Sequence, residues 1–441
     1  MDRARGPLLL AGITCALFAA ALATSTPADA ASSRWARPRA TSTTTTSTTT
    51  TTSTSTSTTT TVANTTTTTT TTVTPPTAGA RDLAVYVPSW DTGVPVERMA
   101  DPSRATEAIY AFVPIVSGRC SVGAADTTRL AQLGALRSTR PSLRITLAVG
   151  GASDSAPFST ATASAAARQT LASSCVAAAR ANGADGIDVD WEYPASPTER
   201  TNLTAFAQEL RRQMSAAPTT GSANPWLLSV AVPASTYTLS TSFDVAALAA
   251  VVDRVNLMAY DYYGSWAQWT PSGNKRITGH HSGLYGNAAD PSGSDNATVP
   301  VLDWLTSAGV TLAKVRLGVP FYGRVWGGVG ATNNGLWQAW SSTPGYEEPN
   351  ACTYRALVAN GWLDANGNAA GGFTRTFDTV SRVPTLYNPT TRTFISYDDT
   401  TSLSGKAAYA RSRGLAGVMV WHGGGDTDDH RLLAALASGL A

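Results

Sequence analysis

The segment from Asp185 to Pro194 reads D-G-I-D-V-D-W-E-Y-P, which places carboxylates at alternate positions. In an extended strand successive side chains point to opposite faces, so Asp188, Asp190 and Glu192 would share one face. Neighbours on that face lie about 6–7 Å apart, two residues of strand rise, so they resist ionising together and hold a proton between them. One carboxyl group can then stay protonated near neutral pH and act as a general acid.

The opposite face of this segment carries Ile187, Val189 and Trp191, a large apolar surface. Two other interpretations of the acidic row are a solvated edge and a divalent-cation site with oxygen ligands. The flanking Gly186 and the bulky Trp191 argue against a solvated edge, so we predict a site for acid–base chemistry with no metal and no cofactor. The histidines of the chain do not have metal-ligand spacing: His280, His281, His422 and His430.

Short apolar or β-branched runs recur along the chain with helical segments between them, which is typical of a parallel α/β fold. The expected closure is a (β/α)₈ TIM barrel, whose chemistry lies at the carboxyl ends of the strands. The predicted strands are Leu83–Val87, Ala108–Val113, Arg144–Val149, Gly186–Asp190, Leu227–Val232, Arg254–Ala259, Val315–Val319 and Gly417–Trp421. The predicted helices include Thr127–Leu136, Ala163–Ala181, Glu199–Ala216 and Gly405–Arg413.

One spacing departs from this alternation. About residues 326–397 are rich in Gly, Asn, Trp and Tyr, too long for a plain connection, and contain the strand-like pieces Thr374–Phe377 and Thr393–Ser396. We predict an inserted α+β subdomain between strand seven and the helix that follows it. The alternative, a disordered loop, fits the aromatic content less well.

The predicted strand ends carry further motifs, and together with the acidic decapeptide they resemble the chitinases of glycoside hydrolase family 18. The similarity extends over nearly the whole domain, residues 78–441. Besides D-G-I-D-V-D-W-E-Y-P, it rests on Tyr86 and Trp90, Tyr110-Ala111-Phe112, Met258-Ala259-Tyr260-Asp261, T-G-H-H-S-G-L-Y from Thr278 to Tyr285, L-G-V-P-F-Y-G-R from Leu317 to Arg324, and Trp421.

The resemblance implies a substrate-assisted mechanism, in which the carbonyl oxygen of the substrate's 2-acetamido group is the nucleophile. Glu192 would protonate the glycosidic oxygen and then activate water. Asp190 would hold the acetamido N–H and balance the oxazolinium ion, while Asp188 shares a proton with it. Tyr260 would donate its hydroxyl to the acetamido oxygen.

The resemblance also implies a substrate-binding cleft at the barrel mouth, with Trp421 as the apolar floor beneath the reacting sugar. Trp90 would lie on the non-reducing side and Trp266 on the reducing side, where flat rings stack on sugars. Trp326 and Trp337 are further candidates for stacking. The remaining lining residues are Tyr86, Phe112, Gly150, Gly151, Met258, Asp261, Tyr322 and Arg324.

The third strand departs from the family's S-x-G-G pattern, because Ala148 stands where the serine is usual. In relatives that hydroxyl donates to the deeper aspartate, so we expect Asp188 to depend more on Tyr86. Losing a donor to the charged form raises the pKa of a carboxyl group, which would shift the acidic limb of the pH–rate profile. Ala152 also stands where an aromatic residue often follows the glycines, which predicts a weaker sugar platform on the reducing side.

The N-terminal region predicts export. Basic residues precede an apolar run and Ala28-Asp29-Ala30, so residues 1–30 resemble a secretory signal peptide. Residues 31–77 are a short tail and a Thr/Ser-rich linker that cannot bury a core. A secreted and cell-wall-associated monomer is expected. The mature chain has Cys120, Cys175 and Cys352, which permit at most one disulfide, and its pairing stays open.

The expected partner is a neutral polymer, chitin or chitooligosaccharides. The net charge of +2 without a basic run in the domain disfavours nucleic acid, and no membrane contact is expected after signal cleavage. Two alternatives stay open: hydrolysis of peptidoglycan or of the N-glycan core, and a chitin-binding lectin on the same barrel. The lectin is disfavoured because Glu192 is present.

Overall fold

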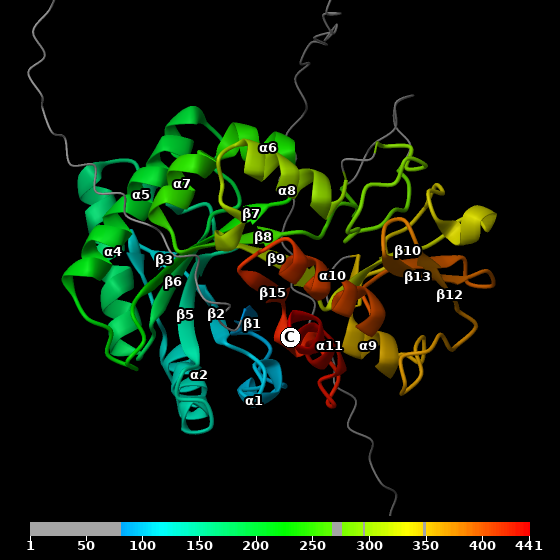
Figure 1. The fold of residues 1–441 in the computed structure, drawn as a ribbon, viewed down its shortest axis with the longest axis horizontal. Helices are drawn as coiled ribbons and strands as arrows, with labels where there is room; N and C mark the ends of the chain where they lie inside the picture. Colours follow the sequence, from blue (N-terminus) through cyan, green and yellow to red (C-terminus); the bar gives the residue numbers. More distant parts are fainter. Residues whose placement is uncertain (1–80, 267–275, 294–295, 347–349) are drawn as a thin grey trace, which may run out of the picture. The chain divides into compact units, whose positions relative to one another are not determined.

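The computed structural model of the chain describes residues 81–266, 276–293, 296–346 and 350–441 (Figure 1). The predicted signal peptide at residues 1–30 and the Thr/Ser-rich linker at residues 31–77 lie outside the described residues. The structural statements below concern the described ranges.

Parallel strands form a closed barrel in the order β1-β15-β9-β8-β7-β6-β5-β2. Each predicted strand is present, so the predicted TIM barrel is confirmed. The closure pairs β1 with β2 and with β15, which joins the two ends of the domain. The barrel strands are β1 (Asp82–Pro88), β2 (Glu107–Val113), β5 (Arg144–Gly150), β6 (Gly186–Asp190), β7 (Leu227–Pro233), β8 (Arg254–Met258), β9 (Val315–Pro320) and β15 (Gly417–Trp421).

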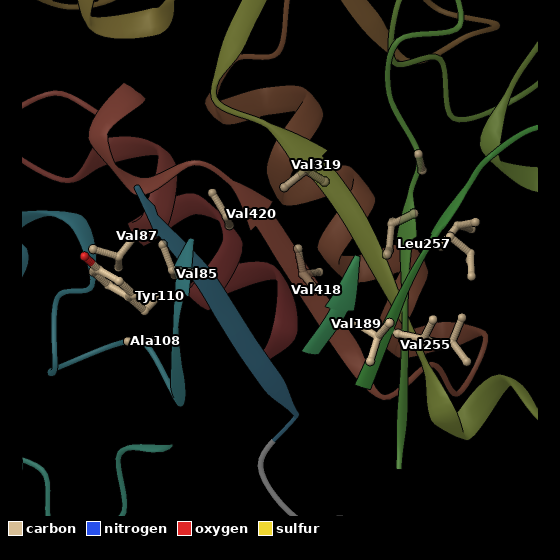
Figure 2. Close-up of a cluster of buried hydrophobic side chains, with 14 of the residues drawn as sticks. Val85, Val87, Ala108, Tyr110, Val189, Val255, Leu257, Val319, Val418 and Val420 are labelled. Carbon is tan, nitrogen blue, oxygen red and sulfur yellow. The ribbon is translucent and has the colours of Figure 1, made fainter. Parts of the chain in front are cut away.

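The two faces of the barrel strands differ in composition. Outward positions carry Val, Leu and Ile, which pack under the helices, as Figure 2 shows for Val85 and Val87 of β1 and Val418 and Val420 of β15. Inward positions of the same strands form a separate cluster that includes Ala84, Tyr86, Ile109, Ala111, Ala148 and Met419. Residues within one strand thus alternate between the helix layer and the barrel interior.

Helices cover the outside of the barrel, and polar caps set where they begin. The predicted helix at Thr127 begins at Ala124, because the Asp126 carboxylate accepts a hydrogen bond from Gly123 N–H. The predicted helix at Gly405 begins at Thr400, after an Asp399 N-cap. The helices are α1 (Val96–Met99), α2 (Ala124–Ala135), α3 (Phe158–Ala161), α4 (Ala165–Ala181), α5 (Pro197–Ala216), α6 (Thr236–Ser242), α7 (Val245–Val251), α8 (Thr298–Ser307), α10 (Thr400–Ser412) and α11 (Arg431–Leu440).

A second, antiparallel sheet lies in the chain between β9 and α10, where the insertion is predicted (Figure 1). Its strand order is β11-β10-β14-β13-β12. The strand that comes first in the chain, β10, starts at Tyr322, four residues before the predicted boundary at 326. A separate apolar cluster around Trp326, Tyr387 and Phe394 supports it. The elements are β10 (Tyr322–Trp326), β11 (Ala351–Thr353), α9 (Tyr354–Ala359), β12 (Thr374–Asp378), β13 (Val383–Asn388) and β14 (Thr393–Ser396).

A disulfide joins Cys120 to Cys175. Cys120 ends β4 (Arg119–Cys120), which forms a hairpin with β3 (Ile115–Val116), and Cys175 lies in α4. Cys352 is buried in β11 of the insertion. The bond therefore fixes the loop after β2 to the helix that precedes β6.

We expect the disulfide to stabilise the native state, because it closes a loop with a sequence separation of 55 residues. The double variant Cys120→Ser/Cys175→Ser should lose about 2–4 kcal/mol of unfolding free energy. Urea titrations of both proteins, with and without reductant, measure this loss. Reductant should destabilise the wild type and leave the double variant unchanged, and equal midpoints for both oxidised proteins would contradict the expectation.

Candidate active site

The acidic row lies at the carboxyl end of β6, inside the barrel. Asp188 is fully buried, Asp190 is 3% exposed and Glu192 lies two residues beyond Asp190 at the strand's end. Trp191, on the opposite side of the chain, is stacked on Phe158 with ring centroids 5.1 Å apart. The predicted division of this segment into an acidic and an apolar face is therefore present.

Asp188 accepts hydrogen bonds from several strands around it. The Tyr86 hydroxyl donates to Oδ2 at 2.7 Å, Ser229 Oγ donates to Oδ1 at 2.6 Å and Asn256 Nδ2 donates to Oδ1 at 3.0 Å. Burial raises the pKa of Asp188, and the hydrogen bonds from Ser229 and Tyr86 oppose this rise, so the net change is upward. These donors all favour the ionised carboxylate.

Tyr86 donates to Asp188 as expected, but it does not act alone, because Ser229 and Asn256 donate to the same carboxylate. Ala148 and Ser229 are the direct neighbours of Asp188 on the flanking strands β5 and β7, respectively. The hydroxyl that Ala148 cannot provide on one side is provided by Ser229 on the other. Asp188 thus has hydroxyl donors from β1 and β7.

Asp190 has the opposite environment. Its Oδ1 is buried and has no hydrogen-bond partner among the described residues. Burial, followed by the charges of Glu192 and Asp188, raises the pKa of Asp190 well above its ordinary value. Donors surround Asp188 and none reaches Asp190 Oδ1, so the geometry favours Asp190 as the holder of a proton shared by the two aspartates.

Glu192 is held through its backbone by a residue that the sequence did not single out. Ser155 Oγ accepts a hydrogen bond from Glu192 N–H at 2.8 Å and lies 3.2 Å from the carbonyl oxygen of Asp190. Burial raises the pKa of Glu192, a hydrogen bond with Tyr193 lowers it and the charge of Asp261 raises it, so the net change is upward. A protonated Glu192 at the mouth of the barrel can donate a proton to a bound molecule.

Gly150 and Gly151 allow the chain to pass close to the acidic row. Both have positive φ, and Gly151 N–H donates to the carbonyl oxygen of Asp190 at 2.8 Å. A Cβ at Gly150 would overlap that same carbonyl oxygen, and one at Gly151 would overlap the ring of Phe112. Glycine is required at these positions by the close approach of β6 and Phe112.

Aromatic rings surround the acidic row. Trp421 lies 5.5 Å from Phe112, 5.3 Å from Tyr86 and 6.2 Å from Trp90, measured between ring centroids. Trp421 contacts the inward-facing barrel cluster together with Phe112, Met258 and Tyr260. Trp90 is 52% exposed and can stack on a bound ring, whereas Trp421 forms a floor inside the mouth.

Tyr260 faces the same space. It lies against the inward-facing cluster, and its ring centroid is 6.2 Å from that of Tyr322. Burial and the nearby acidic groups raise the pKa of Tyr260 well above its ordinary value. Its hydroxyl group therefore stays protonated and available as a donor.

Asp261 and Arg324 form a second charged pair in the site. Arg324 Nε and Nη2 donate to the two carboxylate oxygens of Asp261 at 2.8 and 2.7 Å, and the Tyr322 hydroxyl donates at 2.7 Å. Burial alone would raise the pKa of Asp261, but the charge of Arg324 and hydrogen bonds from His281 and Arg324 hold it well below its ordinary value. Asp261 is therefore ionised under all relevant conditions, unlike Asp190.

Arg324 also reaches a ring at the surface. Its guanidinium carbon lies 4.7 Å from the ring centroid of Trp266, which is 53% exposed. The charged pair and the exposed ring are therefore one connected unit. Trp326 does not extend this surface: it is fully buried in the second sheet, so its predicted stacking role is wrong. Trp337 is partly buried against the same apolar cluster, and its stacking role stays a prediction.

The structure brings together predicted residues of β1, β2, β5, β6, β8, β10 and β15 and of the loops that follow some of them, and it adds Ser155, Ser229 and Asn256. The added residues are single polar side chains within apolar or glycine-rich stretches. A polar residue at an inward position of a barrel strand was the available signal for Ser229 and Asn256. Ser155 lies in a loop, and no pattern in the sequence distinguishes it from its neighbours.

Among the described residues, no group of three or more His, Cys, Asp or Glu side chains is placed to hold a metal ion. Within the same ranges, no helix has both the length and the apolar character that crossing a bilayer requires.

A sequence model of the family described as glycosyl hydrolases family 18 matches residues 82–426. Chitinase A1 of Niallia circulans is 36% identical over 328 residues, which cover 70% of this chain and 44% of that protein. Among solved structures, a family 18 N-acetylglucosaminidase from Paenibacillus barengoltzii has a TM-score of 0.68 and 30% identity and covers 81% of this chain and 99% of its own. A class V chitinase mutant from Nicotiana tobaccum, in complex with NAG4, has a TM-score of 0.68 and 25% identity and covers 81% of this chain and 98% of its own.

Replacing Ser229 by Ala should raise the pH at which the pair Asp188–Asp190 titrates. The loss of one hydrogen bond to a charged carboxylate corresponds to about one pH unit. Carboxyl-carbon NMR of Asp-labelled protein, with Asp188→Asn for assignment, measures the titration without any substrate.

The matched control adds a hydroxyl on the other side of Asp188. The double variant Ser229→Ala/Ala148→Ser should titrate near the wild-type pH, because Ala148 is the neighbour of Asp188 on β5. If the Ser229→Ala variant titrated at the wild-type pH, the hydrogen bond from Ser229 would not contribute to the charge of Asp188, and the prediction would be wrong.

Proposed function

Because the chain belongs to glycosyl hydrolases family 18, we propose that it is a chitinase that hydrolyses the β-1,4 linkages of N-acetylglucosamine polymers. The reaction would be substrate-assisted and would retain the anomeric configuration through an oxazolinium intermediate. One observation carries the proposal: Asp190, with a buried and unpartnered Oδ1, lies between the ionised Asp188 and Glu192 at the mouth.

In the first step, the acetamido carbonyl oxygen of the substrate forms a bond to the anomeric carbon as the glycosidic bond breaks. Glu192 gives its proton to the departing oxygen. Asp190 accepts the acetamido N–H with its unprotonated oxygen, and the single negative charge of the pair Asp188–Asp190 lies beside the positive oxazolinium ion. The unpartnered Oδ1 of Asp190 supports this role, because such an acceptor can bind an N–H that arrives with the substrate.

In the second step, Glu192 as carboxylate takes a proton from water, and the resulting hydroxide attacks the anomeric carbon and opens the oxazolinium ring. The Tyr260 hydroxyl would donate to the acetamido oxygen. Trp421 would form the floor under the reacting sugar and limit access of water to the intermediate. Its close packing with Phe112 and Tyr86 supports a rigid floor.

The pH dependence follows from the charges that each step needs. Activity requires one negative charge on the pair Asp188–Asp190, so it is lost as pH falls and the pair becomes fully protonated. It also requires a proton on Glu192, so it is lost as pH rises through the raised pKa of that group. The profile is therefore expected to be bell-shaped, with its basic limb above the ordinary titration range of a glutamate.

Binding along the cleft would use the exposed rings. Trp90 is proposed to stack on sugars on the non-reducing side, and Trp266 on the reducing side, held by Arg324. The proposed ligands are chitin and chitooligosaccharides, and the proposed location is outside the cell, based on the signal-like residues 1–30. We also propose that the protein is a monomer and that it binds neither nucleic acid nor a membrane.

The variant Glu192→Gln should abolish most hydrolysis of chitin hexamer, because a general acid contributes about 10²–10⁴-fold to the rate. Mass spectrometry and anomer-resolved NMR of a product time course measure this, and wild-type products should keep the β-configuration. Glu97→Gln, at an exposed position of α1, is the matched control and should behave as wild type.

Other outcomes of that time course separate the alternatives. Binding of the hexamer without products from the wild type would favour a lectin. Cleavage of purified peptidoglycan or of an N-glycan core, with the hexamer left intact, would move the substrate to those polymers. De-N-acetylated oligomers should resist cleavage, because they lack the acetamido oxygen that acts as nucleophile.

Replacing Trp266 by Ala should weaken binding of long oligomers, because one exposed stacking contact is lost. A loss of about 0.5–1.5 kcal/mol corresponds to a KM about twofold to tenfold higher for the hexamer. Steady-state kinetics on oligomers of increasing length measure it, and the shortest cleaved oligomer serves as internal control. An equal change in KM at every length would contradict a platform at the end of the cleft.

A further inference from the structure

Beneath the acidic row, the barrel interior contains a buried ion pair. Arg316 of β9 donates to Glu107 of β2 at 2.5 Å, and each side chain is 1% exposed. Glu107 also accepts a hydrogen bond from Thr146 at 2.6 Å. Arg316 also binds Asp82 at the rim, which in turn binds Arg254, so the charges of this cluster balance.

Asn256 connects the ion pair to Asp188. Arg316 Nη1 lies 3.4 Å from Asn256 Oδ1, and Asn256 Nδ2 donates to Asp188 Oδ1 at 3.0 Å. An amide has one acceptor oxygen and one donor nitrogen, and Arg316 has only donors, so Arg316 selects the orientation in which Asn256 presents N–H to Asp188. The guanidinium is therefore one side chain away from the ionised carboxylate.

Fold stability alone does not require this arrangement. The interior layers of such barrels are usually filled by bulky branched apolar residues. Replacing a buried ion pair by apolar residues of similar volume is often neutral or stabilising, because desolvation of two charges is costly. A buried ion pair beneath a row of carboxylates instead has an electrostatic consequence for them, since the interior screens charges weakly.

We propose that Arg316 and Glu107 are positioning residues for the reaction: with Asn256, they fix the negative charge of the aspartate pair on Asp188 and leave the proton on Asp190. This inference rests on the proposed function, and it adds Arg316 and Glu107 as residues beneath the acidic row that set the charge of Asp188.

The groups that face Asp188 come from every strand packed around it. Tyr86, Ser229, Asn256 and Arg316 favour its charged form, whereas burial, Glu107 and Asp190 oppose it. Glu107 raises the pKa of Asp188 and Arg316 lowers it. The two members of one ion pair therefore act in opposite directions, and a loss of packing would not produce this difference in sign.

The test uses two variants of the full chain, and the second is expected to reverse the shift in titration pH that the first produces. Glu107→Gln removes the anion, and the remaining Arg316 should lower the titration of the aspartate pair by about one pH unit. Glu107→Gln/Arg316→Met then removes the cation without leaving an unpaired buried carboxylate at 107, and should move the titration back up by a similar amount. Carboxyl-carbon NMR without substrate measures both, and the acidic limb of kcat/KM for chitin hexamer should move in parallel.

A matched control removes another buried Arg–Asp pair at the start of β6. Arg137 binds Asp185, which is fully buried and has no described contact with Asp188. Arg137→Met/Asp185→Asn should lower the thermal midpoint as the Glu107 variants do, while the titration and the pH profile stay at wild type.

The outcomes separate the inference from the proposed function. Titrations that stay at the wild-type pH in both variants, with only thermal midpoints lowered, would overturn the inference and leave the ion pair as a structural element. Titrations that move while the acidic limb stays fixed would also overturn it, because the charge would not matter for the reaction. A wild type without hydrolase activity would refute the proposed function, and the NMR titrations would still report whether the ion pair sets the charge on Asp188.

Discussion

Two carboxyl groups, Asp188 and Asp190, are buried two residues apart on one strand of a barrel, and the interior cannot hold both as anions. The rest of the site depends on how that conflict is resolved. The structure resolves it by asymmetry: Asp188 accepts hydrogen bonds from three side chains, whereas Asp190 has an oxygen without a partner. One proton therefore has a defined place, and the carboxyl group nearest to the substrate keeps an unused acceptor.

The surrounding elements preserve this burial while leaving Glu192 accessible. Gly150 lets β5 approach the backbone of Asp190, and Gly151 lets the Phe112 ring approach the chain beside it, because neither glycine has a Cβ. The Trp421 ring packs on Phe112 and Tyr86 beside the acidic row. In the proposed reaction such a floor would limit water where charge must be stabilised, and this would strengthen the electrostatic interactions within the site.

Structural features that repeat at a regular residue spacing were predictable from the sequence, whereas single residues outside such a pattern were not. The barrel strands repeat at a regular spacing with apolar outward positions, and the acidic row repeats every second residue, so both were predicted from the pattern. Ser229 was missed because one serine in an apolar strand has no period of its own. Trp326 was misassigned because its burial depends on pairing of β10 with β14, where it lies opposite Phe394, 68 residues further along the chain. Such long-range contacts leave no local signal.

The pair Asp261–Arg324 shows how the same residue type obtains a different charge a short distance away. Asp261 is partly exposed, and a bidentate guanidinium compensates its charge, so its pKa is lowered while that of Asp190 is raised. A fixed anion beside Glu192 raises the pKa of that group. Carboxyl groups of one site thus differ in the direction of their pKa shifts, and the burial, cations and donors around each one set that direction.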